Sequence, residues 1–244
     1  MKGRLVHRSQ LSSEDEEIMF SLFQKHFEGV PREWFRRDLD EKNWVILLDG
    51  IENGALSGFS TLDFYDTCYQ GVPLSVVYSG DTIVDPAAWG SSALSRIWIG
   101  SVNHLRRTYS KQTLYWFLLV SGYRTYRFLP IFWRDFYPRC DAPTPPATQA
   151  LMDFLAEERF GPLYHRPEGV VRFTSPQILR EDLRGIPPGR LKDRHVAFFA
   201  GRNPGHGRGD ELVCLTEISY DRLTPAGKRV WVAGEGAVAE EHGP

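Results

Sequence analysis

Three consecutive β-strand patterns in the first half of the chain restrict its fold more than any other feature. Trp44 to Leu48 is continuously apolar, and a turn containing Asn53-Gly54 connects it to Leu56 to Phe64, so the two segments predict a hairpin. The next run, Val72 to Val84, is rich in β-branched residues and ends at Asp85-Pro86. These strands predict a meander whose apolar faces other elements must cover.

Helical patterns lie on both sides of this meander. Before it, Ser13 and Glu16 form a capping box in front of apolar residues at helical spacing, and Pro31 opens a second segment, PREWFRRDL. After it, the segment from Leu94 to Leu105 carries one apolar stripe. A buried strand, TLYWFLLV, and a segment at 123–139 with aromatic residues at helical spacing follow, although Pro130 predicts a kink or a late start.

The second half of the chain differs in composition. Residues 141–190 begin with the linker DAPTPPATQ, continue as a short helix at 149–160, and predict an insertion. HVAFFA and ELVCLTEI predict two late strands, and the small, acidic tail at 233–244 is expected to be disordered. We therefore expect an α/β fold with a single domain over residues 1–232.

Composition excludes several classes of protein. Among 244 residues, 29 Lys and Arg stand against 31 Asp and Glu, a net charge of −2, so no general attraction to nucleic acid is expected. The three cysteines are isolated, which argues against a disulfide framework or a structural zinc site. The start of the sequence has no apolar core of the signal-peptide kind, and the longest apolar run, Leu114 to Val120, is too short to cross a bilayer. We expect a cytoplasmic protein without a membrane span.

The order of these elements resembles that of the GNAT (N-acetyltransferase-like) acyltransferase superfamily over roughly residues 5–140 and 192–220. The resemblance implies a central mixed, mostly antiparallel sheet flanked by helices, with the insertion before the last two strands. In that family the fourth strand, the loop after it and the third helix bind the pantetheine and phosphates of the acyl donor. The matching segment here is TIVDPAAWGSSAL. The donor-binding residues that we expect are Ile83, Val84, Trp89, Gly90, Ser91, Ser92 and, as a phosphate or carrier-protein contact, Arg127.

Physical chemistry explains why such a segment suits a thioester donor. The first N–H groups of a helix lack partners within the helix and attract a phosphate, and small residues let the backbone come close. The family pattern has a basic residue and two glycine or alanine positions, where this chain has Trp89, Ser92 and Leu94. The donor is therefore expected to be either acyl-CoA or the 4'-phosphopantetheine of an acyl carrier protein, as in the long-chain, carrier-protein-using branch.

Five residues are candidates for the chemistry. Asp81 lies inside a strand, where Asp is unfavourable, and the resemblance assigns such a carboxylate to proton removal from the acceptor ammonium; the alternative is a solvated residue at a bulge. The resemblance also implies that Tyr126 or Tyr137 protonates the leaving thiolate, with Tyr123 as a third choice; the alternative is aromatic core packing. His206, in the loop GRNPGHGRG, could act as a base or belong to a surface turn.

The sequence as a whole predicts an N-acyltransferase. It would move an acyl group from a pantetheine thioester to an amine, on a small molecule or a peptide, by direct attack in a ternary complex and without a metal. Two alternatives stay open. One is a catalytically silent GNAT-like module that binds an acyl carrier or a peptide. The other is an enzyme of the same fold that hydrolyses thioesters or decarboxylates.

Overall fold

The computed structural model describes residues 2–50, 56–86, 92–181, 183–236 and 238–240, the last of these as backbone alone. The predicted Asn53-Gly54 turn and residues 89–91 lie outside this part of the chain.

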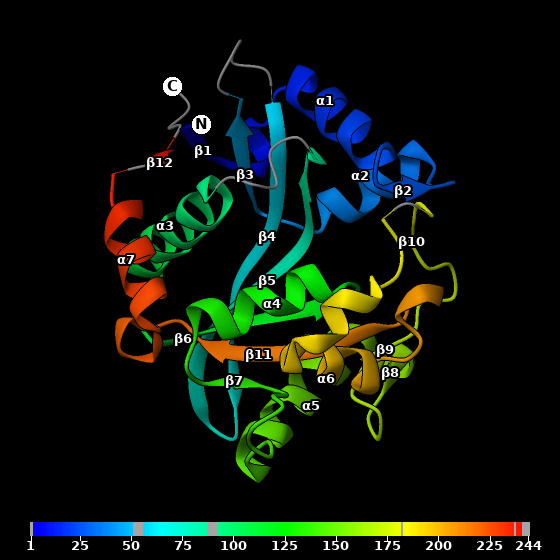
Figure 1. Ribbon diagram of the computed structural model, residues 1–244. Coiled ribbons are helices and arrows are strands. Elements are labelled where there is room, and N and C mark those ends of the chain that lie inside the picture. The colour runs from blue at the N-terminus through cyan, green and yellow to red at the C-terminus, as the bar shows by residue number, and fades with distance from the viewer. Residues whose placement is uncertain (1, 51–55, 87–91, 182, 237, 241–244) are drawn as a thin grey trace.

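One large sheet organises the molecule (Figure 1). Its strands are, in spatial order, β12 (Val238–Glu240), β1 (Lys2–His7), β3 (Trp44–Asp49), β4 (Leu56–Tyr69), β5 (Val72–Val84), β6 (Thr113–Val120), β11 (Glu211–Glu217), β9 (Val170–Val171) and β8 (Tyr164–His165), with β7 (Phe136–Tyr137) also paired to β11. The β1–β12 and β5–β6 pairs are parallel, and the other pairs of the sheet are antiparallel. A separate pair joins β2 (Phe27–Glu28) to β10 (Ile178–Leu179).

Helices cover both faces of the sheet. They are α1 (Ser13–Gln24), α2 (Arg32–Asp40), α3 (Ala93–Tyr109), α4 (Tyr123–Phe132), α5 (Pro146–Phe160), α6 (Arg194–Arg202) and α7 (Pro225–Gly234), with short 3-10 turns that include η4 (Pro188–Lys192), η5 (His206–Arg208) and η6 (Tyr220–Arg222). The mixed sheet flanked by helices confirms the predicted fold class.

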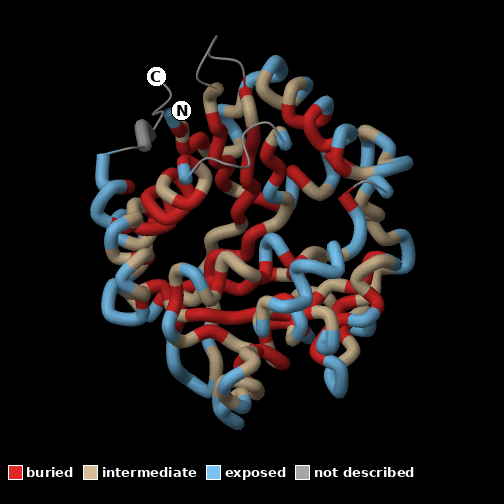
Figure 2. The backbone as a smooth tube through the Cα atoms, in the orientation of Figure 1, coloured by how far each residue is buried: buried red, intermediate tan, exposed pale blue. Residues whose placement is uncertain are grey.

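The core is divided by this sheet, and buried residues follow its strands while the outer sides of the helices are exposed (Figure 2). On one face, α3, α4, α6 and α7 share a single apolar cluster with the strands. The opposite face has two clusters, one under α1 and α2 and one under α5. We call these the α3/α4 face and the α2/α5 face.

The structure corrects three predicted elements. HVAFFA is part of helix α6 and not a strand, because Asp193 caps the helix by accepting from the His195 N–H, and Val196 and Phe199 are buried at helical spacing. Tyr137 lies in β7 and not in a helix, since α4 ends two residues after Pro130, which cannot donate to the helical ladder. Part of the expected disordered tail forms β12 beside β1.

Candidate functional site

Strands β5 and β6 separate before either one ends. Their parallel pairing runs from Leu74 opposite Thr113 to Ser79 opposite Leu118. Beyond this point β5 continues with β4 alone as far as Val84, while β6 continues with β11. Within the described residues, no strand pairs with Gly80–Val84 on the side that β6 has left.

A β-bulge marks the place of separation. Ser79 lies opposite Leu62, and Thr82 lies opposite Ser60, so β5 holds one more residue than β4 between these pairs. The bulge needs Gly80, because a Cβ there would lie 2.6 Å from Thr61 Oγ1 and 2.7 Å from Lys42 Cε. A bulge therefore exists at the expected place, and it redirects the β5 strand that carries Asp81.

A cavity of about 1000 Å³ occupies the region around the separation. Its lining comes from Gly80–Val84 of β5, the end of α2, the starts of α3 and α4, the segment 173–185 of the insertion, His206 and Glu211. Ile83 belongs to the cluster under α1 and α2, and Val84 to the cluster under α3 and α4. Because neighbouring β5 residues face opposite sides of the sheet, the cavity has walls on both faces.

Two carboxylates meet in this cavity on the α2/α5 face. Asp81 precedes Ile83 by two residues, and Glu211 precedes Val213 by two, so both share the face of those residues. Loss of hydration, and then the charge of Asp38, raise the pKa of Asp81 well above its ordinary value, although Lys42 opposes this rise. The same two causes raise the pKa of Glu211 to about 7. Neither carboxylate has a hydrogen bond or ion pair within the described part of the chain.

Tyr78 lines the cavity, and Lys42 lies behind it. The Lys42 side chain is only 1% exposed, and its ammonium donates to the Asp38 backbone oxygen at 2.9 Å and pairs with Asp38 Oδ1 at 3.0 Å. It lies 5.6 Å from the centroid of the Tyr78 ring, which the Arg159 guanidinium approaches to 4.0 Å. Burial raises the pKa of Tyr78 well above its ordinary value, so the phenol keeps its proton at neutral pH.

The structure brings some of the expected donor-binding residues together. Ile83, Val84 and Ser92 line the cavity, and so does Arg127, whose Nε pairs with Asp193 at 3.0 Å. Trp89, Gly90 and Ser91 lie outside the described residues.

The expected catalytic residues divide into two groups. Asp81 and His206 both line the cavity. His206 Nδ1 donates to the Asn203 backbone oxygen at 2.8 Å, so Nε2 is the ring nitrogen of His206 that is left for other contacts. Tyr126 is fully buried away from the cavity lining, and its hydroxyl donates to the Pro138 oxygen at 2.8 Å. Tyr137 in β7 is not part of the lining either, whereas Tyr123 at the start of α4 is.

Sequence reasoning missed Glu211, Asp38, Lys42 and Tyr78. An acidic residue directly before an apolar strand, as Glu211 is, has the pattern of a surface turn. Asp38 and Lys42 lie in a charged helical segment that predicts a solvated face. Only the register of β5 with β4, and the position of β11 beyond β6, bring these residues to one place.

In the described part of the chain, no helix combines the length and the apolar character that a membrane span requires. No group of three or more His, Cys, Asp or Glu side chains that could hold a metal ion was found among the same residues.

Comparison with known proteins gives matches at the level of structure. No family model and no curated protein matches the sequence. A GNAT family N-acetyltransferase from Escherichia coli in complex with CoA is 14% identical, with 52% of this chain and 68% of that chain covered and a TM-score of 0.39. A GCN5-related N-acetyltransferase from Kribbella flavida is 10% identical (91% and 67% covered, TM-score 0.40), and glucosamine-6-phosphate N-acetyltransferase from Arabidopsis thaliana is also 10% identical (48% and 82% covered, TM-score 0.36). The strand order of this chain, in a mixed sheet with helices on both faces, is the α/β fold class that its sequence predicted.

Proposed function

We propose that this protein is an N-acyltransferase that moves an acyl group from a pantetheine thioester to an acceptor amine by direct attack in a ternary complex. One observation supports this above all. The cavity at the separation of β5 and β6 has, on one face of the sheet, two carboxylates without an ion pair among the described residues, and on the other face two helix starts.

The α3/α4 face suits the donor. The N-caps of α3 and α4, Ser92 and Gly122, line the cavity, and neither helix has a side-chain cap, so a phosphate fits against their starts. The Asp85 N–H donates to the Ser57 backbone oxygen on β4 at 2.8 Å. Backbone N–H and C=O groups point to alternate sides along a strand. The N–H and C=O of Thr82 therefore point away from β4, toward the space that β6 has left. A pantetheine amide can pair with this edge, and acyl-CoA and an acyl carrier protein both present one.

The α2/α5 face suits the acceptor. The Asp81 carboxylate takes a proton from the acceptor ammonium, and the freed amine attacks the thioester carbonyl carbon. A C–N bond forms and the C–S bond breaks. Tyr123, the tyrosine of α4 that lines the cavity, gives its proton to the departing thiolate and takes back the proton that the new amide nitrogen loses. Burial raises the pKa of Asp81 well above its ordinary value, and a carboxylate with a raised pKa is a stronger base than a solvated one.

The test is turnover of purified full-length protein. Acetyl-CoA, a long-chain acyl-CoA and an acyl carrier protein are each incubated with a panel of amines, and thiol release and product mass are measured. An amide product supports the proposal. Free acid without amide points to a thioester hydrolase, and binding of the donor without any turnover points to a silent module; either result overturns it.

A further inference from the structure

The acceptor half of the cavity gathers the carboxyl groups of Asp38, Asp81 and Glu211. Lys42 is committed to Asp38 through two contacts. Asp81, which Lys42 also attracts, and Glu211 have no hydrogen bond or ion pair in the described part of the chain. The ionised form of two neighbouring, desolvated carboxyl groups costs free energy unless cations pair with them.

A third polar group in the same place lacks a partner. Tyr78 is 7% exposed and lines the cavity, and its hydroxyl has no hydrogen bond within the described residues. A phenol hydroxyl can accept from an ammonium N–H as well as donate. Because Tyr78 lines the cavity and its hydroxyl is not among the atoms shut off from solvent, a ligand atom in the cavity can reach this hydroxyl.

The walls around these groups favour a cation as well. Phe27 and Phe173 also line the cavity, and the faces of aromatic rings attract cations.

The positive residues of the lining are directed elsewhere. Arg124 and Arg127 stand on α4, on the opposite face of the sheet. Arg37 lies over the Trp34 ring at 5.8 Å, and Arg184 Nε donates to the Leu179 oxygen at 2.9 Å. Arg190, in η4, precedes α6, which packs with α4 on the α3/α4 face.

We infer that the acceptor is a diamine: one amino group reacts beside Asp81, and a second, which stays an ammonium, is held by Glu211 and the Tyr78 hydroxyl. This inference rests on the proposed acyl transfer. Asp81 is assigned to the reacting end because it lies on β5, the strand along which the donor is placed. Glu211 starts β11, on the other side of the separation, and therefore holds the distal end.

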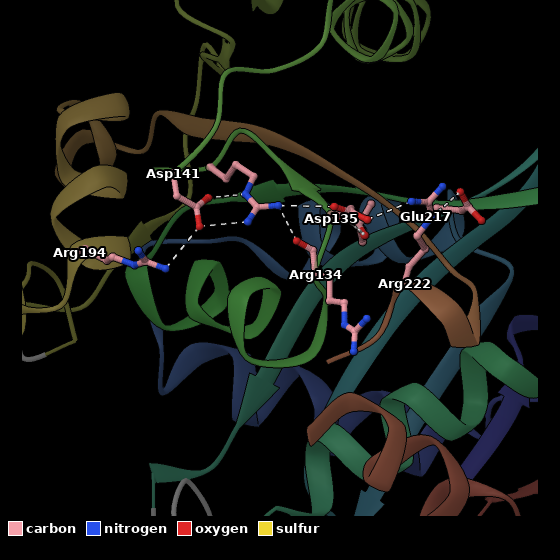
Figure 3. Close-up of polar contacts among 8 residues, drawn as sticks. Arg134, Asp135, Asp141, Arg194, Glu217 and Arg222 are labelled. Atoms are coloured by element: carbon pink, nitrogen blue, oxygen red, sulfur yellow. Dashed lines mark hydrogen bonds and ion pairs between the residues drawn. The ribbon is translucent and has the colours of Figure 1, made fainter. Parts of the chain in front are cut away.

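The test compares 1,4-diaminobutane with 4-aminobutan-1-ol, which has the same length but one ammonium. With the full-length protein at pH 7.5, kcat/KM for the diamine should exceed that for the amino alcohol at least about tenfold. Glu211→Gln should bring this ratio close to one. The matched control is Glu217→Gln on the same strand, where the carboxylate pairs with Arg222 at 3.5 Å away from the cavity (Figure 3), and it should leave the ratio unchanged.

A second measurement works without a donor. Calorimetry should show that 1,4-diaminobutane binds the protein more tightly than the amino alcohol does, and Tyr78→Phe, which keeps the ring, should weaken that binding several-fold even if Glu211→Gln fails to fold.

The outcomes separate the two proposals. Amide formation with a ratio near one in the unaltered protein overturns the diamine and leaves acyl transfer standing. Diamine binding that Tyr78→Phe weakens, without amide formation on any amine, supports the two-cation site and overturns the transfer reaction. Displacement of the diamine by MgCl₂ or CaCl₂ at a low concentration points to a metal site and overturns the diamine.

Discussion

Trp116 donates its indole N–H to the Ser79 hydroxyl at 2.9 Å, at the last pair of β5 with β6 before the strands separate. Both side chains are buried on the α3/α4 face, where Trp116 also packs on Trp98 with ring centroids 4.3 Å apart. The bond ties β6 to β5 where the backbone ladder stops. It therefore fixes the point from which the cavity opens.

Ser79→Ala should lower the free energy of unfolding by about 1–2 kcal/mol, because it leaves the buried indole N–H without its partner. Urea denaturation measures the loss. The double variant Ser79→Ala/Trp116→Phe separates this bond from the packing of Trp116, since the two substitutions should be non-additive by about 1 kcal/mol. Additive losses would show that the bond does not stabilise the fold.

Asp81→Asn should reduce acyl transfer roughly 100-fold or more, because an amide cannot take the proton of the acceptor ammonium. In the unaltered protein the rate should rise with pH as Asp81 loses its proton, and the midpoint should lie well above that of an ordinary aspartate. Asp85→Asn is the control, since Asp85 follows the same strand but pairs with Lys25 at 3.3 Å outside the cavity lining. Equal rates for the two variants would remove Asp81 from the reaction.

Glu211→Gln should change how stability depends on pH. The pKa of Glu211 is about 7 in the fold and near 4.5 in an unfolded chain, so the folded state binds more protons between these values. The unaltered protein is therefore destabilised, relative to the variant, as pH rises from about 4.5 through 7. The loss should reach roughly 3 kcal/mol and level off above about pH 8. Thermal melts from pH 4 to 8, with Glu217→Gln as control, measure this. A difference that does not vary with pH contradicts the burial of this charge.

Gly209→Ala should loosen the segment that walls the acceptor side. Gly209 has a φ of +90°, and a Cβ there would lie 2.4 Å from the Pro176 Cβ. The substitution should cost about 1–3 kcal/mol and increase hydrogen exchange in residues 173–180. Gly207→Ala, two residues away, is matched to it, because a Cβ there meets no atom within 4 Å. If both variants exchange alike, the contact with Pro176 does not hold this wall in place.

Arg139 is the centre of a chain of surface ion pairs that joins α6, the segment after β7, η6 and β11 (Figure 3). Its hydrogen bonds to Asp141 lower the pKa of that carboxyl to about 2, so the pair stabilises the fold above the ordinary pKa of 3.8 and less as pH falls through 2. Arg139→Gln should cost less than about 1 kcal/mol at pH 7, and the cost should shrink at about 0.5 M salt. Arg134→Gln is the control, because that side chain points away from the ion pairs. A cost that salt does not change would show that packing, and not charge, is lost.

Local patterns predicted most of the elements near the site, because their signals lie within a few residues of each other. The alternation and β-branching of β5, the apolar stripe of α3 and the run TLYWFLLV of β6 each occur at the expected place. Signals that depend on the neighbours were misread. HVAFFA is apolar enough for a strand, and only the Asp193 cap and the packing of Val196 and Phe199 make it helical.

The sequence by itself predicted most of the strands and helices, the mixed sheet that they form, and Asp81 as a candidate residue that proved to line the cavity. It could not reveal Glu211 or Lys42, which stand 130 and 39 positions from Asp81 in a chain of 244 residues. Only the tertiary structure decided how these groups interact. The bulge in β5 and the departure of β6 bring them close together, and there the carboxyl groups of Asp81 and Glu211 lose hydration and feel the charge of Asp38.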